Sequence, residues 1–279
     1  MKRYGIILLL VLCGSLFAND FRFYTDYAGF YDADTPFVEL YFMLPRAAMT
    51  HRSVHDQRKE GKFIIAVNLY HEDHRVFSGS VVLDDILPDN EEISPDEHIP
   101  GLMSLHLMPG RYAMQVAVRD FYSGKTAQRN RDIIIRDLDV SKLTLSDIQI
   151  ASYVMETRQK NMFTKLDRYD VIPLANPEFD RNNGIFYTYY EIYRLHPGGS
   201  YVCQSSIRDM NGNAVIENEA VETAAPGMLE VVIDRMDVRD LVSGIYMYRV
   251  HVKDLTSGEE AVAEKRILLA QKASMEVYT

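Results

Sequence analysis

Several residue types are scarce in this chain. Its 279 residues include no tryptophan and two cysteines, Cys13 and Cys203. The 15 glycines and 10 prolines are too few for a collagen-like or low-complexity protein. No apolar run reaches the roughly 20 residues that a membrane-spanning helix needs. Apolar residues at 47 % and charged residues at 25 % are globular proportions, and the 18 tyrosines and 12 phenylalanines favour β-strands.

The first residues have the pattern of an export signal. Two basic residues precede the apolar segment 6–13, and Ala18 ends a cleavage site before Asn19. We therefore expect a signal peptide over residues 1–18, removed between Ala18 and Asn19. A membrane anchor would need a longer apolar run. A leucine precedes Cys13 where a lipidation site has a small residue, so lipid attachment at Cys13 is disfavoured.

The mature chain is expected to be acidic and free of internal disulfides. Loss of residues 1–18 removes two basic residues and changes the net charge from −10 to −12, which disfavours nucleic acid as a partner. The longest basic cluster, Arg129, Arg131 and Arg136, is interpreted as a solvated strand edge. Cys203 then has no second cysteine to pair with, so the fold must depend on apolar cores.

The chain contains an internal repeat. Residues 107–124 align with residues 241–258 at a constant offset of 134, and eight of the 18 positions are identical. The identities include Gly110/Gly244, Tyr112/Tyr246 and Asp120/Asp254. A repeat of this length indicates duplicated domains rather than a solenoid. Both copies alternate as half-buried strands do, end in a Ser-Gly turn, and have a tyrosine placed as in the tyrosine corner of immunoglobulin-like sandwiches.

These patterns predict an all-β protein with two tandem antiparallel β-sandwich domains of the immunoglobulin or fibronectin-III type after the signal peptide. The first domain is expected over residues 19–139 and the second over 144–271, followed by a tail at 272–279. An insertion at 155–183 has no counterpart in the first domain, and long insertions are either functional or disordered. Residues 152–165 are the one candidate for an amphipathic helix.

Individual strands can also be expected from the period of two. In the first domain they are placed near residues 21–24, 37–44, 63–71 and 75–83, and in the second near 145–154, 185–195, 201–209, 214–219 and 228–233. An acidic loop is expected over residues 84–96.

Four segments carry a resemblance to a known family. Residues 145–151, 171–177 and 186–193, together with 37–45 in the first domain, are similar to the N-terminal β-domain region of the GWxTD domain-containing proteins. These are exported bacterial proteins without an assigned biochemical function. The likeness covers about residues 37–270, but the absence of tryptophan means that the Gly-Trp-x-Thr-Asp motif region is missing. The resemblance implies a pair of β domains in the envelope of a Gram-negative bacterium, in the periplasm or at the cell surface.

Two turns carry residues that metal sites also use. The histidines concerned are His51, His55, His71 and His74. Imidazole is a common metal ligand, but the spacing within 71–74 differs from a helical His-Glu-x-x-His pair, and a polar turn is favoured. Segment 209–213 begins like a calcium loop, yet alanines occupy the sixth and twelfth positions, so a hairpin turn is favoured. No metal and no cofactor is expected.

No pattern of a catalytic nucleophile is present. Cys203 lies on an alternating run with Tyr201 and Ser205, which favours a buried small residue over a reactive thiolate. Acidic pairs at 84–85 and 91–92 fall in the expected acidic loop, whereas a glycosidase needs two acids that converge on a cleft. The sequence therefore predicts a protein that is not an enzyme.

Tyrosines of the second domain are the stronger functional lead. Tyr189 and Tyr190 are adjacent and must face opposite sides of a strand, so one of them meets either the insertion or a ligand. We favour the insertion, and keep Tyr187, Tyr189 and Tyr190 as candidate binding residues. The leading hypothesis is an exported, non-catalytic binding or scaffold protein whose partners are other envelope proteins. The alternative is an accessory carbohydrate-binding or protease-associated module that uses the insertion and these tyrosines.

Overall fold

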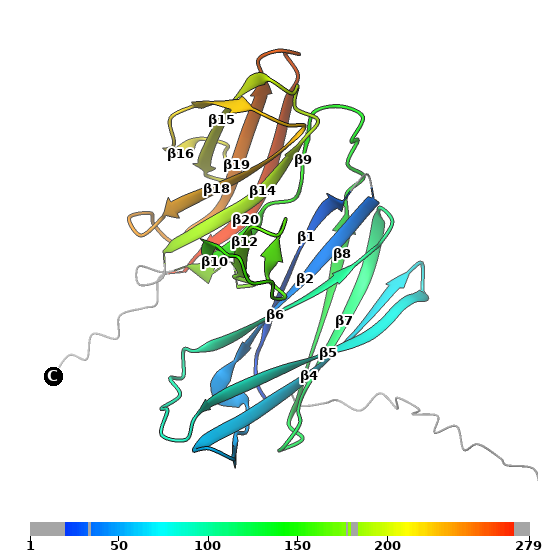
Figure 1. Cartoon of the computed structure of the whole chain (residues 1–279), viewed down its shortest axis with the longest axis vertical. Helices are drawn as coiled ribbons and strands as arrows, with labels where there is room; N and C mark the ends of the chain where they lie inside the picture. The colour runs from blue at the N-terminus through cyan, green and yellow to red at the C-terminus, as the bar shows by residue number, and fades with distance from the viewer. Residues whose placement is uncertain (1–19, 33–34, 177, 180–183, 271–279) are drawn as a thin grey trace, which may run out of the picture.

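A computed structural model describes residues 20–32, 35–176, 178–179 and 184–270. The expected signal peptide at 1–18 and the tail at 272–279 lie outside the described residues. Within them the chain forms twenty strands and a single short 3-10 helix, η1 (Arg46–Ala48). The all-β prediction is confirmed, and Figure 1 shows the strands gathered into two stacked bodies.

The first sandwich, residues 20–135, has two antiparallel sheets. One contains β1 (Tyr24–Asp32), β2 (Thr35–Pro45) and β6 (His98–Leu105), in that order. The other contains β3 (Arg52–Val54), β4 (Arg58–His71), β5 (His74–Pro88), β7 (Gly110–Asp120) and β8 (Thr126–Ile135). Alternate residues of both sheets, such as Leu40 and Ile65, are fully buried in the core between them.

The second sandwich, residues 144–270, also has two sheets. One contains β9 (Thr144–Leu145), β10 (Gln149–Glu156), β11 (Thr164–Lys165), β12 (Tyr169–Pro173), β14 (Ile185–Tyr193) and β18 (Leu229–Asp237). The other contains β13 (Glu178–Phe179), β15 (Gly199–Arg208), β16 (Ala214–Glu217), β17 (Val221–Ala225), β19 (Gly244–Asp254) and β20 (Glu260–Leu269). Tyr190 and Tyr248 lie fully buried in its core.

The internal repeat corresponds to the hairpins β7–β8 and β19–β20. Tyr112 faces Ile133 across the first hairpin, as Tyr246 faces Ile267 across the second. The hydroxyl of Tyr112 donates to the carbonyl of Met108 at 2.7 Å, and that of Tyr246 donates four residues back at 3.0 Å. These are the backbone hydrogen bonds of a tyrosine corner, so that expectation is confirmed in both copies.

The repeated aspartates have one structural role. Asp120 and Asp254 are 0 % and 2 % exposed, and each carboxylate accepts backbone amides from its own turn. Each also accepts an amide from a distant loop, that of Thr50 for Asp120 and that of His196 for Asp254, at 3.2 and 2.7 Å. The carboxylate therefore ties the hairpin turn to another part of its own sandwich.

Three local expectations are corrected. The segment 152–165 is not a helix, because its first residues belong to β10 and Val154 pairs with Val171 of β12. The first strand is β1, Tyr24–Asp32, rather than a strand near 21–24. Part of the expected acidic loop at 84–96 is strand, since β5 continues to Pro88 and places Asp85 in the interior at 7 % exposure. In each case the pairing with a neighbouring strand of the sheet decides the local structure.

Candidate functional site

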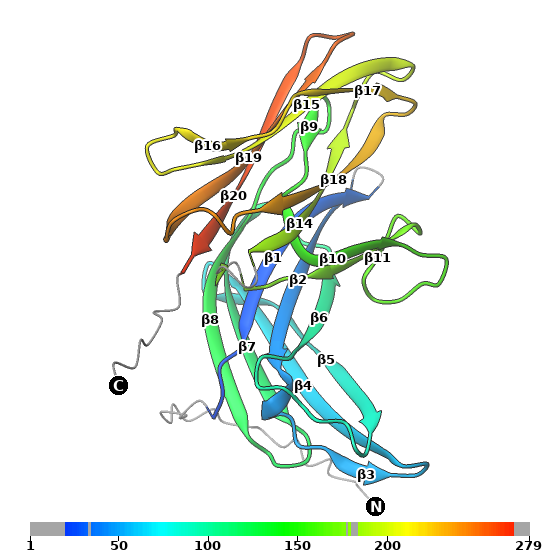
Figure 2. The same ribbon diagram turned by 90° about the vertical axis from the view of Figure 1, so that its left-hand side faces the viewer.

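The two sandwiches meet over a buried apolar cluster. Its members are Ala28, Phe30, Tyr41, Leu102, Ala151, Val171, Ala175 and Tyr189. The ring of Phe30 from β1 meets the ring of Tyr189 from β14 edge-on, with centroids 6.0 Å apart. In Figure 2 the strands β1 and β2 rise beside β10 and β14, where this contact is made. We call this contact region the junction.

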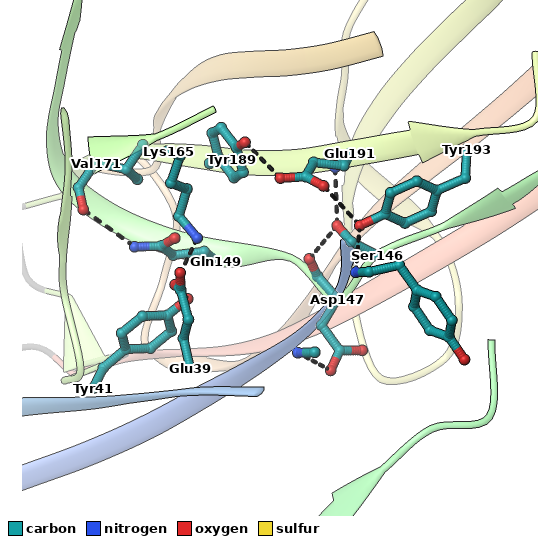
Figure 3. Close-up of polar contacts among 12 residues, drawn as sticks. Glu39, Tyr41, Ser146, Asp147, Gln149, Lys165, Val171, Tyr189, Glu191 and Tyr193 are labelled. Carbon is teal, nitrogen blue, oxygen red and sulfur yellow. Dashed lines mark hydrogen bonds and ion pairs between the residues drawn. The ribbon is translucent and has the colours of Figure 1, made fainter. Parts of the chain in front are cut away.

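An ion pair crosses the junction beside the cluster. The Nζ of Lys165, on β11 of the insertion, lies 2.5 Å from a carboxylate oxygen of Glu39 on β2 (Figure 3). Both side chains are less than a tenth exposed, and the Tyr41 hydroxyl donates to the same carboxylate at 2.7 Å. The ammonium also lies 3.8 Å from the centroid of the Phe30 ring, where the ring face attracts a cation. The insertion is thereby fastened to the first sandwich.

A second buried acid lies on β14. The hydroxyls of Tyr189 and Tyr193 donate to the two carboxylate oxygens of Glu191, each at 2.7 Å. The backbone amide of Tyr31 in β1 donates to the Tyr193 hydroxyl at 3.0 Å, so this network also crosses the junction. Burial raises the pKa of Glu191 above its usual value, although the two hydroxyls and the charge of Lys165 act against the shift.

Replacement of Glu191 by glutamine should change how stability depends on pH. Because the pKa of Glu191 is raised in the folded protein, its contribution is fully present below the unfolded pKa and is lost as pH rises through the folded pKa. Urea unfolding from about pH 4 to about pH 8 should therefore show the wild-type protein losing stability relative to Glu191→Gln. The exposed Glu217 on β16 offers a control, Glu217→Gln. Parallel pH profiles for the two variants would contradict the expectation.

A cleft of about 590 Å³ lies next to these acids. It is lined by β2, β6, the β11–β12 turn and Glu191. Leu166 and Asp167 of the turn have φ of +47° and +55°, a left-handed conformation that is strained for leucine. The carboxylate of Glu39 accepts a hydrogen bond from the Lys165 ammonium, and that of Glu191 accepts hydrogen bonds from the hydroxyls of Tyr189 and Tyr193. These acids converge, but their hydrogen bonds serve to join the sandwiches.

The candidate binding tyrosines do not form an exposed aromatic surface that a ligand could contact. Tyr189 and Tyr190 are both fully buried, and Tyr187 is half-buried. Tyr189 packs against Val171 of the insertion segment, the neighbour that the sequence favoured. It also packs against the first sandwich, and no pattern in the sequence indicated that contact. Tyr190 points into the core of the second sandwich, with its hydroxyl 3.0 Å from the Sγ of Cys203. Neither Tyr189 nor Tyr190 has a face open to a sugar or a peptide.

Three of the candidate histidines, His51, His71 and His74, and the 209–213 turn have hydrogen-bond partners. His51 is 3.0 Å from a carboxylate oxygen of the buried Asp85, and His71 is 3.0 Å from the carbonyl of Arg111. Asp209 accepts two backbone amides of its own turn, as expected for a hairpin. The described part of the chain contains no group of three or more side chains that could hold a metal ion.

The arginine cluster lies on and just after the edge strand β8, where Arg129 and Arg136 are exposed as expected, but its side chains also bond to other segments. Arg129 donates to the carbonyl of Phe23 at 3.0 Å, Arg131 donates to that of Thr25 at 2.6 Å, and Arg136 pairs with Asp147 at 2.6 Å. The sequence places β1 and β8 far apart, so their contact could not be anticipated. These arginines therefore cover the outer edge of β1 and reach the second sandwich.

No protein-family model and no characterised protein sequence matches the chain. Its structure aligns over most of its length with parts of several solved structures, at low TM-scores. Dimeric latent PorU from Porphyromonas gingivalis aligns at 12 % identity and a TM-score of 0.30, over 89 % of this chain and 20 % of PorU. A red sea bream transglutaminase aligns at 8 % identity and a TM-score of 0.26, over 90 % of this chain and 32 % of the transglutaminase. A Bacteroides uniformis β-glucuronidase 2 mutant aligns at 9 % identity and a TM-score of 0.29, over 87 % of this chain and 27 % of the glucuronidase.

The chain thus spans a fifth to a third of the length of these structures. No helix in the described residues is long and apolar enough to cross a membrane.

Proposed function

We propose that this chain is an exported, non-catalytic binding or scaffold protein of a Gram-negative envelope, of the GWxTD-related kind, whose partners are other envelope proteins. The junction is the observation that supports the proposal. Domains in one chain move relative to each other unless their interface is large and apolar. Here the apolar cluster, the buried Lys165–Glu39 pair and the Tyr31–Tyr193 hydrogen bond all join the two sandwiches.

A scaffold must hold its binding surfaces at a fixed spacing, and this junction provides that property. A partner that contacts both sandwiches then binds without the entropy loss of fixing their relative orientation. The alternative, an accessory carbohydrate-binding or protease-associated module that uses the insertion and the tyrosines, loses the support of Tyr189 and Tyr190, because both rings are fully buried. Tyr187 is half-buried.

Export and partner binding can be tested together. The full chain, expressed in a Gram-negative host, should appear in the periplasmic fraction with Asn19 as its first residue. A photo-crosslinking amino acid at Val242, which is 69 % exposed, should give discrete protein adducts, whereas the same amino acid at the buried Tyr41 should give none. Deletion of residues 2–18 is the control for export. A full-length chain that stays in the cytoplasm, or adducts absent from all exposed positions tried, would contradict the proposal.

A further inference from the structure

Basic side chains from both sandwiches converge on one cleft. The cleft has a volume of about 570 Å³ and lies at the junction, between β1 and β8 on one side and β20 on the other. The basic residues that line it are Arg129, Arg131, Arg136, Lys265 and Arg266. They come from segments about 130 residues apart and meet only because the junction holds the sandwiches together. A volume of this size is typical of sites for organic ligands and far exceeds that of one inorganic anion.

The acids in this cleft do not neutralise its basic residues. Three acids line it, which leaves a formal excess of two positive charges in a chain whose net charge is −10. Asp26 is shared by Arg131 and Lys265, at 3.3 and 2.5 Å. Asp147 pairs with Arg136, and Glu264 pairs with Arg249, which is not in the cleft lining.

Two basic residues of the cleft are left without an acidic partner. Among the described residues, neither Arg129 nor Arg266 makes an ion pair, and both are exposed. One N–H group of Arg129 donates to the Phe23 carbonyl, and its other N–H groups can donate to solvent or to a ligand. Guanidinium groups bind carboxylates and phosphates through paired hydrogen bonds, so these two side chains fit either group.

The strand edge beneath the cleft cannot accept a peptide strand. β1 is an edge strand of its sheet, and its outward backbone groups would be the template for strand addition. The outward carbonyls of Phe23, Thr25 and Tyr27 accept Arg129, Arg131 and Lys265, and Gly29 pairs through its amide and carbonyl with Asp147. A ligand of this cleft must therefore bind through side chains.

The remaining wall of the cleft is partly apolar. Tyr24, Tyr27 and Ile134 line it, and the guanidinium of Arg131 lies 5.3 Å from the centroid of the Tyr27 ring. Carbohydrate rings present C–H groups beside their polar substituents, and aromatic residues next to arginines are suited to such a surface. We propose that the cleft binds an anionic saccharide, through carboxylate or phosphate groups that contact Arg129 and Arg266. This proposal rests on the proposed function, since it names one ligand of the same non-catalytic protein.

Binding can be measured by calorimetry on the full mature chain at low salt, with trigalacturonic acid as the probe. Arg129→Gln with Arg266→Gln should weaken binding at least tenfold, and added salt should weaken it further. The matched control removes two positive charges from exposed sites outside the cleft, Arg111→Gln with Arg168→Gln, and should leave affinity unchanged. Arg266→Glu is a second test that disturbs no hydrogen bond to β1.

Three further probes separate the sources of the anion. Maltotriose should not bind, because it has the rings without the charge. Triglutamate and inorganic phosphate should bind at least tenfold more weakly than trigalacturonic acid. Equal binding of triglutamate would assign the cleft to acidic peptides, and equal competition by phosphate would reduce it to a small-anion site. Either result, or unchanged affinity in both cleft variants, overturns the saccharide proposal. Absence of binding by an exported, cross-linkable chain would overturn it and leave the proposed function standing.

Discussion

Replacement of Lys165 by methionine should lower the free energy of unfolding by about 3–5 kcal/mol, the range found when one partner of a buried ion pair is removed. The Glu39 carboxylate would remain in the interior with only the Tyr41 hydroxyl as a donor. The substitution would also remove the attraction between the Lys165 ammonium and the Phe30 ring. Urea denaturation followed by tyrosine fluorescence measures this change, since the chain has no tryptophan.

A double variant separates the uncompensated charge from lost packing. Glu39→Gln with Lys165→Met should recover part of the loss, because no buried charge is left unpaired. Arg168→Met, three residues away and exposed, is the control for removing a positive charge from the insertion. A loss below about 1 kcal/mol for Lys165→Met, typical of an exposed pair, would show that the pair does not fasten the junction.

Replacement of Asp254 by alanine should cost roughly 3 kcal/mol, because hydrogen bonds to a charged group each contribute about 1.5–3 kcal/mol and unsatisfied buried amides are costly. The amides of His196, Thr256 and Ser257 would lose their acceptor. Burial alone would raise the pKa of Asp254, but these hydrogen bonds outweigh it and hold the pKa below its usual value. The wild-type advantage should therefore be complete above the ordinary carboxyl pKa and disappear as pH falls through the lower folded value.

The repeat supplies a matched comparison for this result. Asp120→Ala should show the same loss and the same acid dependence, because Asp120 has the equivalent hydrogen bonds and a lowered pKa. Asp209→Ala, in the exposed β15–β16 turn, should have a smaller effect since water replaces its partners. Equal losses for Asp209 and Asp254 would show that the connection to the distant loop contributes nothing.

Features set by neighbouring residues could be predicted from the sequence. The hairpins β7–β8 and β19–β20 follow from a period of two and a Ser-Gly turn, and the tyrosine corners follow from a tyrosine two residues after a glycine at the start of a strand. The turn at 209–213 likewise depends on its own side chains.

Features of the junction depend on residues that are distant in the chain. Lys165 and Glu39 are 126 positions apart, and nothing near either residue marks it as paired. The spacing of apolar residues in segment 152–165 fits a helix as well as a strand. The pairing of β10 with β12 decides between them. The hydrogen bonds from the arginines of β8 to Phe23 and Thr25 could not be anticipated, because their acceptors lie 106 residues earlier.

The contact between Tyr190 and Cys203 has a consequence for redox chemistry. Burial raises the pKa of the Cys203 thiol to about 11, although the hydrogen bond with the Tyr190 hydroxyl acts against that shift. At neutral pH the sulfur is then almost entirely protonated, and a protonated thiol neither attacks disulfides nor oxidises readily. A lone cysteine of this kind can persist in an oxidising compartment without linking one copy of the protein to another.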